Sequence, residues 1–150
     1  MNKKVPYVIH KHNAFKAGLH FDFRIKYLDK NMLASFAIPK EKFPVGPGSK
    51  SIAIKVNDHS MSWLKRDNVK IPRGEYGGGF LKIVQSGVAD IIYWDKKVIV
   101  FELEGDFANG RYYLFNTNRK KATSRKNSTS EIWILLQKKE TDQTMNIKEF

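Results

Sequence analysis

The stretch from Leu19 to Ile25 constrains the fold of this chain most, because apolar and polar residues alternate along its whole length. A period of two residues is typical of a β-strand with one face against a core. The apolar residues, which the pattern predicts to face the core, are Leu19, Phe21, Phe23 and Ile25. The polar residues, predicted to share the opposite face at intervals of roughly 7 Å, are His20, Asp22 and Arg24.

Two possible metal ligands and a guanidinium in succession on one strand face indicate an active site. His20 and Asp22, together with His12 from the preceding segment, form the best candidate metal site. Nitrogen and oxygen ligands without sulfur suit Mn²⁺, Fe²⁺ or Zn²⁺ better than Mg²⁺. Three protein ligands leave positions open for water and substrate. By spacing alone, two solvated polar residues remain the alternative interpretation.

Four further residues are candidates for phosphate or metal binding. The planar fork of Arg24 can hold a phosphate with two hydrogen bonds, or it can form an ion pair with Asp22. His59 ends another strand-like segment and can orient a phosphate or protonate a leaving oxygen, or it is a surface histidine. Lys40 follows Pro39 and is a candidate phosphate clamp or a solvated lysine, and His10 is a spare metal ligand.

Short segments rich in aromatic and β-branched residues recur along the chain and predict strands. A glycine-rich turn at residues 71–79 is predicted to pass close to a ligand or another strand, and the basic segment 116–130 to be a flexible loop. We expect an all-β, small single-domain β-barrel of about eight strands with long connecting loops, formed by residues 1–139, with a disordered tail at 140–150. The predicted strands are 6–10, 20–26, 32–38, 51–59, 80–85, 88–94, 97–104, 111–116 and 131–137.

The excess of basic residues favours polyanionic partners. The formal net charge is +12 and the pI is near 9.8, which fits nucleic acid first and an anionic membrane surface second. The chain has no cysteine, hence no disulfide framework or thiolate metal site. Neither an 18-residue apolar run nor a signal-peptide core is present. We therefore expect an intracellular, cytoplasmic protein that does not insert into membranes.

Several motifs occur together and in order, and they resemble one known family. The resemblance covers roughly residues 6–139 and is to the 3′-phosphoesterase domain of bacterial DNA ligase D and its stand-alone relatives. The motifs that carry it are Y-V-I-H-K-H, L-H-F-D-F-R, F-A-I-P-K, V-N-D-H and I-P-R-G-E-Y-G-G-G, followed by Y-W-D, F-E-L-E-G, G-R-Y-Y-L and I-W-I-L-L-Q-K.

This resemblance implies a small β-barrel and a Mn²⁺-dependent enzyme acting on DNA 3′ ends. Such enzymes remove a terminal 3′-ribonucleotide and then the 3′-phosphate, which leaves a 3′-hydroxyl for end joining. In this chain, His12, His20 and Asp22 match the metal ligands. The residues that match the phosphate-binding and catalytic positions are Arg24, His59 and Lys40.

The chain also departs from the family pattern. The interval between the two metal histidines is two residues longer, Asn57 replaces a glutamate, Trp63 replaces a tyrosine, and Lys50-Ser51 replaces an arginine. Binding of metal and phosphate is expected to be retained. The departures put the full two-step activity in question, and either the monoesterase step or the ribonucleotide preference is the one at risk.

Our leading hypothesis is therefore a metal-dependent phosphodiesterase and phosphomonoesterase in DNA repair by non-homologous end joining. The expected substrates are DNA or RNA-tipped DNA 3′ ends, processed by a monomer that works with a separate DNA ligase or polymerase. One alternative is a non-catalytic, partly degenerate nucleic-acid-binding module of the same fold. A second is a non-haem iron oxygenase, since H-x-D plus a distant histidine fits a facial triad, although no anchor for an oxo-acid is evident.

Overall fold

The computed structural model describes residues 3–75, 78–123 and 125–139, and strands dominate it. The two helices in these ranges are short 3₁₀ turns, η1 (Pro39–Glu41) and η2 (Met61–Lys65). The strands are β1 (Lys3–Ala14), β2 (Gly18–Lys26), β3 (Met32–Ile38), β4 (Lys50–Ser60), β5 (Val69–Ile71), β6 (Gly79–Trp94), β7 (Val98–Leu103), β8 (Gly110–Ala122) and β9 (Thr129–Gln137).

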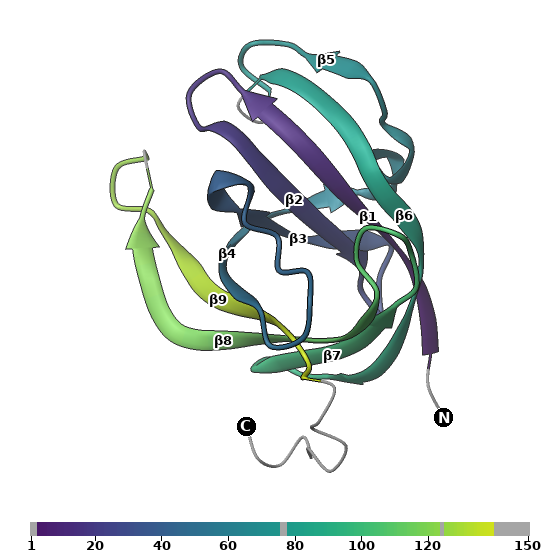
Figure 1. Cartoon of the computed structure of the whole chain (residues 1–150). Helices are drawn as coiled ribbons and strands as arrows, with labels where there is room; N and C mark the ends of the chain where they lie inside the picture. Colours follow the sequence, from purple (N-terminus) through teal and green to yellow (C-terminus); the bar gives the residue numbers. More distant parts are fainter. Residues whose placement is uncertain (1–2, 76–77, 124, 140–150) are drawn as a thin grey trace.

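The strands form one antiparallel sheet that closes on itself. Neighbours follow the order β1-β2-β3-β4-β9-β8-β7-β6-β5, and a further β1–β6 pairing joins the two sides of the sheet. Eight strands thus make a closed barrel, and the short β5 lies outside the ring on β6 (Figure 1). Closure leaves few strand edges unpaired. The prediction of an all-β barrel of about eight strands is confirmed.

The barrel interior is filled by aromatic and branched side chains from alternate strand positions. Phe23 stacks on Phe101 with 5.3 Å between ring centroids, and Phe101 stacks on Tyr112 at 5.8 Å. The predicted core positions Phe21, Phe23 and Ile25 belong to this cluster. Leu19 does not, because it lies near the start of β2 and is 36% exposed. The core therefore begins two residues later than the alternation predicted.

The outer wall of β1–β3 is covered as well. The chain between β4 and β6 folds back over it and forms a second apolar cluster, in which Trp63 of η2 and Ile71 of β5 pack with Leu33 and Leu81. The opposite face of β2 is consequently enclosed between the barrel wall and this cover. His20, Asp22 and Arg24 are at most 8% exposed, so the predicted polar face is a buried layer.

Strand lengths differ from the sequence prediction in three places. β1 has 12 residues and β6 is one strand of 16 where two were predicted. Segment 116–130 was predicted as a flexible loop, and this is wrong for most of it. β8 and β9 continue as a paired hairpin arm out to Ala122 and Thr129 (Figure 1). Arg119 and Lys120 of β8 pair with residues of β9. Cross-strand pairing therefore stabilises strands here despite the polar composition.

The sequence also predicted where the domain ends and that the chain does not insert into membranes. The predicted disordered tail, residues 140–150, lies outside the described residues. The domain boundary at residue 139 therefore stays a prediction. Over the described part of the chain, no helix has the length and apolarity needed to cross a bilayer.

The buried side chain of Gln85 links the barrel wall to the connection between β7 and β8 through hydrogen bonds. The Gln85 amide nitrogen donates to the Tyr7 hydroxyl at 2.7 Å and to the Ala108 carbonyl at 2.8 Å. Its carbonyl oxygen accepts the backbone N–H groups of Phe107 at 3.0 Å and Ala108 at 2.9 Å. One side chain thus satisfies four polar groups in a site that is 9% exposed.

We expect Gln85→Ala to lower the free energy of unfolding by roughly 3 kcal/mol, since buried polar groups left without partners cost about 1–3 kcal/mol each. Urea denaturation followed by tryptophan fluorescence measures the difference. The neighbouring exposed Ser86→Ala is the control. An equal effect of the two substitutions would contradict the structural role of Gln85.

Candidate metal and phosphate site

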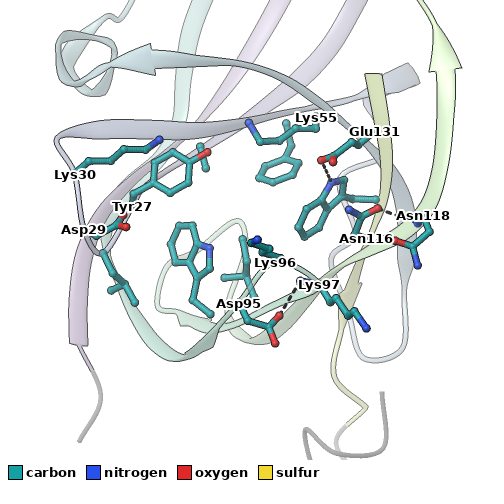
Figure 2. Close-up of a pocket in the computed structure, with 16 residues that line it drawn as sticks. Tyr27, Asp29, Lys30, Lys55, Asp95, Lys96, Lys97, Asn116, Asn118 and Glu131 are labelled. Carbon is teal, nitrogen blue, oxygen red and sulfur yellow. Dashed lines mark hydrogen bonds between the residues drawn. The ribbon is translucent and has the colours of Figure 1, made fainter. Parts of the chain in front are cut away.

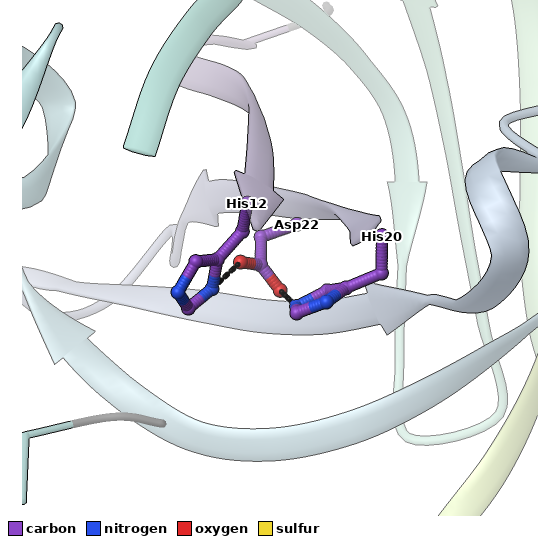
Figure 3. Close-up of side chains that lie close together, drawn as sticks. All are labelled: His12, His20 and Asp22. Atoms are coloured by element: carbon purple, nitrogen blue, oxygen red, sulfur yellow. Dashed lines mark hydrogen bonds and ion pairs between the residues drawn. The ribbon is translucent and has the colours of Figure 1, made fainter. Parts of the chain in front are cut away.

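The candidate site is built on the outer face of the β1–β2 pair. In the antiparallel register His12 lies opposite His20, His10 opposite Asp22, and Val8 opposite Arg24. Residues directly opposite each other point to the same face. Pairing of two alternating strands therefore collects side chains that are eight or more positions apart in the chain. Figure 3 shows His12 and His20 on either side of the Asp22 carboxylate.

The three predicted metal ligands are brought together. The His12 Nδ1 lies 3.2 Å from Asp22 Oδ2, and the His20 Nε2 lies 3.3 Å from Asp22 Oδ1. One donor atom from each residue falls within 4.8 Å of the other two. The rings of His12 and His20 are 4.8 Å apart between centroids. All three residues are buried, so the group is held by the fold.

Backbone carbonyls orient both imidazole rings. His12 Nε2 donates to the Gly78 carbonyl at 2.7 Å, and His20 Nδ1 donates to the Gly18 carbonyl at 3.1 Å. Each histidine is thereby anchored through one nitrogen and turns the other toward Asp22. This is the arrangement of metal-binding histidines, whose second nitrogen is fixed by a carbonyl or carboxylate. The donor set, two imidazoles and one carboxylate, fits a divalent transition metal.

The same arrangement sets the charges. Burial disfavours the charged form of Asp22, but hydrogen bonds from His12 and His20 and the charge of Arg24 outweigh it and hold the pKa of Asp22 well below its usual range. Burial also opposes charge on His20, yet Asp22 raises the pKa of His20 above its usual 6.5. Asp22 is therefore a carboxylate at neutral pH, which is the form that binds a cation.

Arg24 is fully buried beside these ligands. Its Nη2 lies 3.5 Å from Asp22 Oδ2, and its Nη1 donates to His10 Nδ1 at 3.2 Å. The guanidinium also stacks on the Trp63 ring at 4.8 Å. Of the two interpretations of Arg24, the ion pair is the one seen in the structure, and phosphate binding stays a prediction. Its ion pair with Asp22 is present, and it orients the guanidinium next to the candidate metal site.

His10 serves this arginine, so its interpretation as a spare metal ligand is wrong. Its Nε2 donates to the Arg66 carbonyl at 2.8 Å, which leaves Nδ1 to accept from Arg24. Burial and the nearby Arg24 charge lower the pKa of His10 to about 4. His10 is therefore neutral at physiological pH and positions Arg24 by accepting its hydrogen bond.

His59 reaches the site because β4 contains a bulge. Ser35 pairs with Val56 and Leu33 with His59, so three steps along β4 match two along β3. The extra residue turns His59 to the outer face, whereas Ala53 of the same strand lies in the barrel core. Its ring meets Trp63 edge-on at 4.6 Å. Burial and Arg24 lower the pKa of His59 to about 4.

Lys40 is not brought into the cluster. It lies in η1 with φ 55° and its side chain is exposed. Within the described residues, neither a hydrogen bond nor an ion pair joins it to His12, His20 or Asp22. It follows β3, whose Ile38 pairs with Phe21, the residue between His20 and Asp22. Lys40 therefore follows the strand next to β2, close to the end of β2 at which His20 lies.

Two contributors were not identified as site residues from the sequence. The Arg66 guanidinium stacks on Trp63 at 4.0 Å, on which Arg24 also stacks, and its carbonyl holds His10. Gly79 has φ +92°, and a Cβ there would overlap the Asn13 carbonyl, so β6 can approach β1 beside His12. The predicted close approach of the glycine-rich turn to another strand is thus confirmed. No local sequence pattern identified Arg66 as a site residue.

Comparison with known proteins gives a consistent result. Residues 10–116 match the DNA Ligase D 3′-phosphoesterase domain. The multifunctional non-homologous end joining protein LigD of Pseudomonas aeruginosa is 32% identical over 127 residues, which covers 75% of this chain and 13% of that protein. Its counterpart from Mycobacterium tuberculosis is 33% identical over 116 residues, covering 75% and 14%. The chain thus spans about one seventh of the length of these relatives.

We expect Mn²⁺ to raise the melting temperature of the wild-type protein and to leave that of Asp22→Asn unchanged, because a ligand that binds only the folded state stabilises it by mass action. Differential scanning fluorimetry with and without Mn²⁺ measures this. Asp106→Asn, which removes an exposed carboxylate, is the matched control and should keep the shift. Equal shifts for both variants would exclude Asp22 as a ligand.

Proposed function

Since this chain belongs to the DNA ligase D 3′-phosphoesterase domain family, we propose that it is a metal-dependent phosphoesterase acting on DNA 3′ ends. Family membership supports a role in processing DNA ends during non-homologous end joining. The single observation that carries the proposal is the convergence of His12, His20 and Asp22 beside a buried Arg24. The proposed reaction is removal of a 3′-ribonucleotide, a 3′-phosphate, or both.

In this proposal His12, His20 and Asp22 hold the metal ion, with Mn²⁺ the preferred ion. Such an ion polarises a phosphoryl oxygen and lowers the pKa of bound water toward about 7. Asp22 contributes the negative charge, and the two carbonyl-anchored imidazoles supply nitrogen donors, which must be in the neutral form to bind the ion. Their burial keeps these donors oriented before substrate arrives, which is the basis of electrostatic preorganisation.

Arg24 and His59 are proposed to bind the scissile phosphate. Arg24 is pre-oriented by Asp22, His10 and Trp63, so little side-chain entropy is lost on binding. His59 Nδ1 donates to the Asn57 carbonyl at 2.8 Å, which fixes the orientation of the ring. An anionic phosphate beside the ring favours the imidazolium. His59 can then donate a proton to the phosphate or to the leaving oxygen.

Lys40 is proposed as the residue that assists phosphate removal after substrate binds. Its exposed position at the end of β3 lets its side chain reach toward the ligand strand. An ammonium at this place would neutralise charge that develops on the phosphoryl oxygens. The product 3′-hydroxyl is what a DNA ligase reaction consumes, so a DNA ligase is the proposed functional partner.

We expect the wild-type protein with Mn²⁺ to shorten a DNA primer ending in a 3′-ribonucleotide or a 3′-phosphate. His20→Ala should reduce the rate at least about 100-fold. Loss of a group that only orients a metal ligand already lowers metal affinity or activity by about 10–100-fold. Denaturing gel electrophoresis resolves the products, and EDTA should abolish them. Lys40→Ala tests the proposed role of Lys40 in phosphate removal. Lys42→Ala is its matched control, since both lysines are exposed. Undiminished cleavage by His20→Ala would exclude the proposed site.

A non-catalytic DNA-binding role is the second candidate, favoured by Asn57 and Trp63. Asn57 supplies a neutral amide where the family pattern has a carboxylate, and Trp63 packs its ring against Arg24 and His59 without offering a hydroxyl. This role predicts salt-sensitive DNA binding that EDTA leaves unchanged, with no product formed. A cleavage product that depends on added metal rules it out.

We expect Trp63→Tyr to raise 3′-phosphate removal relative to 3′-ribonucleotide removal, because tyrosine keeps an aromatic face for Arg24 and adds a hydroxyl donor. The ratio of the two rates on matched primers is the measurement. Trp63→Phe keeps the ring without the hydroxyl and is the control. If the two variants give the same ratio, the hydroxyl has no role in choosing the step.

A further inference from the structure

A second site lies at another end of the barrel. A cavity of about 700 Å³ opens between the β2–β3 turn, the β6–β7 turn and the base of the β8–β9 arm. In Figure 2, Tyr27 and Asp29 lie on one side of this cavity and Asn116, Asn118 and Glu131 on the other. The buried residues Ala34 and Ile99 form part of its lining, so it reaches into the barrel interior.

Two pairs of aromatic rings line the cavity. Tyr27 and Trp94 lie 5.4 Å apart between centroids, at 34° to each other. Phe36 and Trp133 lie 5.3 Å apart with their planes at 68°. Trp94 is only partly buried, so part of its indole ring is accessible in the cavity. Aromatic faces of this kind bind nucleobases by stacking, because every base has a π-face.

The polar groups around these rings suit a nucleotide. Lys96 and Lys97 are exposed at the rim and can meet a phosphate. The amides of Asn116 and Asn118 offer both donors and acceptors to the edge of a base. Trp133 Nε1 donates to Glu131 at 3.1 Å, which fixes the indole plane. The cavity thus combines stacking surfaces and amides with four lysines and three carboxylates, those of Asp29, Asp95 and Glu131.

A strip of positive charge leads away from the cavity. Asn116 and Asn118 lie at the base of the β8–β9 arm, and the next residues outward, Arg119, Lys120 and Lys121, are all exposed. Successive strand residues point to opposite faces, so Arg119 and Lys121 share one face of the arm and Lys120 lies on the other. Phosphates of a nucleic-acid strand can therefore be neutralised along the arm while a base occupies the cavity.

This cavity is distinct from the metal site. His20 is near the start of β2, whereas Tyr27 follows its end. Seven residues of extended strand separate them, which corresponds to roughly 23 Å. The ligand residues His12, His20 and Asp22 are absent from the cavity lining. A ligand in the cavity would therefore contact the protein far from the proposed reaction centre.

We propose that this cavity binds one base of a single-stranded nucleic acid whose backbone follows the β8–β9 arm. The choice of nucleic acid as ligand rests on the proposed function, while the choice of a base for the cavity rests on its aromatic lining. The site would hold a single-stranded segment away from the end being processed. Base stacking makes it tolerant of sequence.

The test uses the full chain carrying His20→Ala, in EDTA, so that binding is measured without cleavage. Fluorescence anisotropy of a labelled oligodeoxythymidine of roughly eight nucleotides, within the usual site size of such grooves, gives the affinity. Trp94→Leu should weaken binding about tenfold, the effect of losing one stacked base. An abasic oligonucleotide of equal length should bind the parent more weakly and be indifferent to Trp94→Leu.

Lys97→Glu provides a variant at an exposed position, which is not expected to disturb folding. It should weaken binding of the oligonucleotide severalfold at low salt, whereas Lys42→Glu, the same charge change outside the cavity lining, should have a smaller effect. Equal affinities for the normal and abasic strands, or for Trp94→Leu and the parent, would overturn the proposal. Cleavage by the protein with intact His20 is measured separately, so failure of the enzyme assignment and failure of this site are distinguishable.

Discussion

The buried carboxylate of Asp22 is the interaction on which the candidate site depends. An isolated buried charge costs several kcal/mol, and here His12, His20 and Arg24 all contribute to compensating it. These partners come from two adjacent strands. The charge of Asp22 is therefore compensated only when β1 and β2 pair in the observed register. A shift of one residue would turn the whole set to the other face. The fold therefore holds the three candidate ligands and Arg24 as one unit.

The layer outside the barrel wall makes this burial possible. η2 and β5 bring Trp63 and Ile71 over β1–β3, where Trp63 contacts both Arg24 and His59. The same segment, between β4 and β6, contains Gly78 and Arg66, whose carbonyls orient His12 and His10. The cover thus supplies apolar packing, a cation–π surface and hydrogen-bond acceptors. The site lies between two layers, and the barrel interior provides a rigid support beneath it.

Much of this could be predicted from residue patterns, and the failures have identifiable physical causes. Alternation correctly grouped His20, Asp22 and Arg24 on one face, because a strand has a side-chain period of two. Alternation alone does not account for the position of His59, since a bulge in β4 interrupts the period of two. It treated 116–130 as a loop, because composition does not record the pairing between β8 and β9. His10 was misassigned because its partners, Arg24 and the Arg66 carbonyl, come from distant segments.

The amino-acid sequence by itself determined the all-β class, the residue types of the candidate site and their shared strand face, since these follow from local periodicity and side-chain chemistry. Its ordered motifs also pointed to the phosphoesterase family. Only the tertiary structure decided that His12 lies opposite His20, that Trp63 covers Arg24, and that an aromatic cavity opens at the other end of β2. These are contacts between segments far apart in the chain, and they depend on register, bulges and closure of the barrel, which no local pattern encodes.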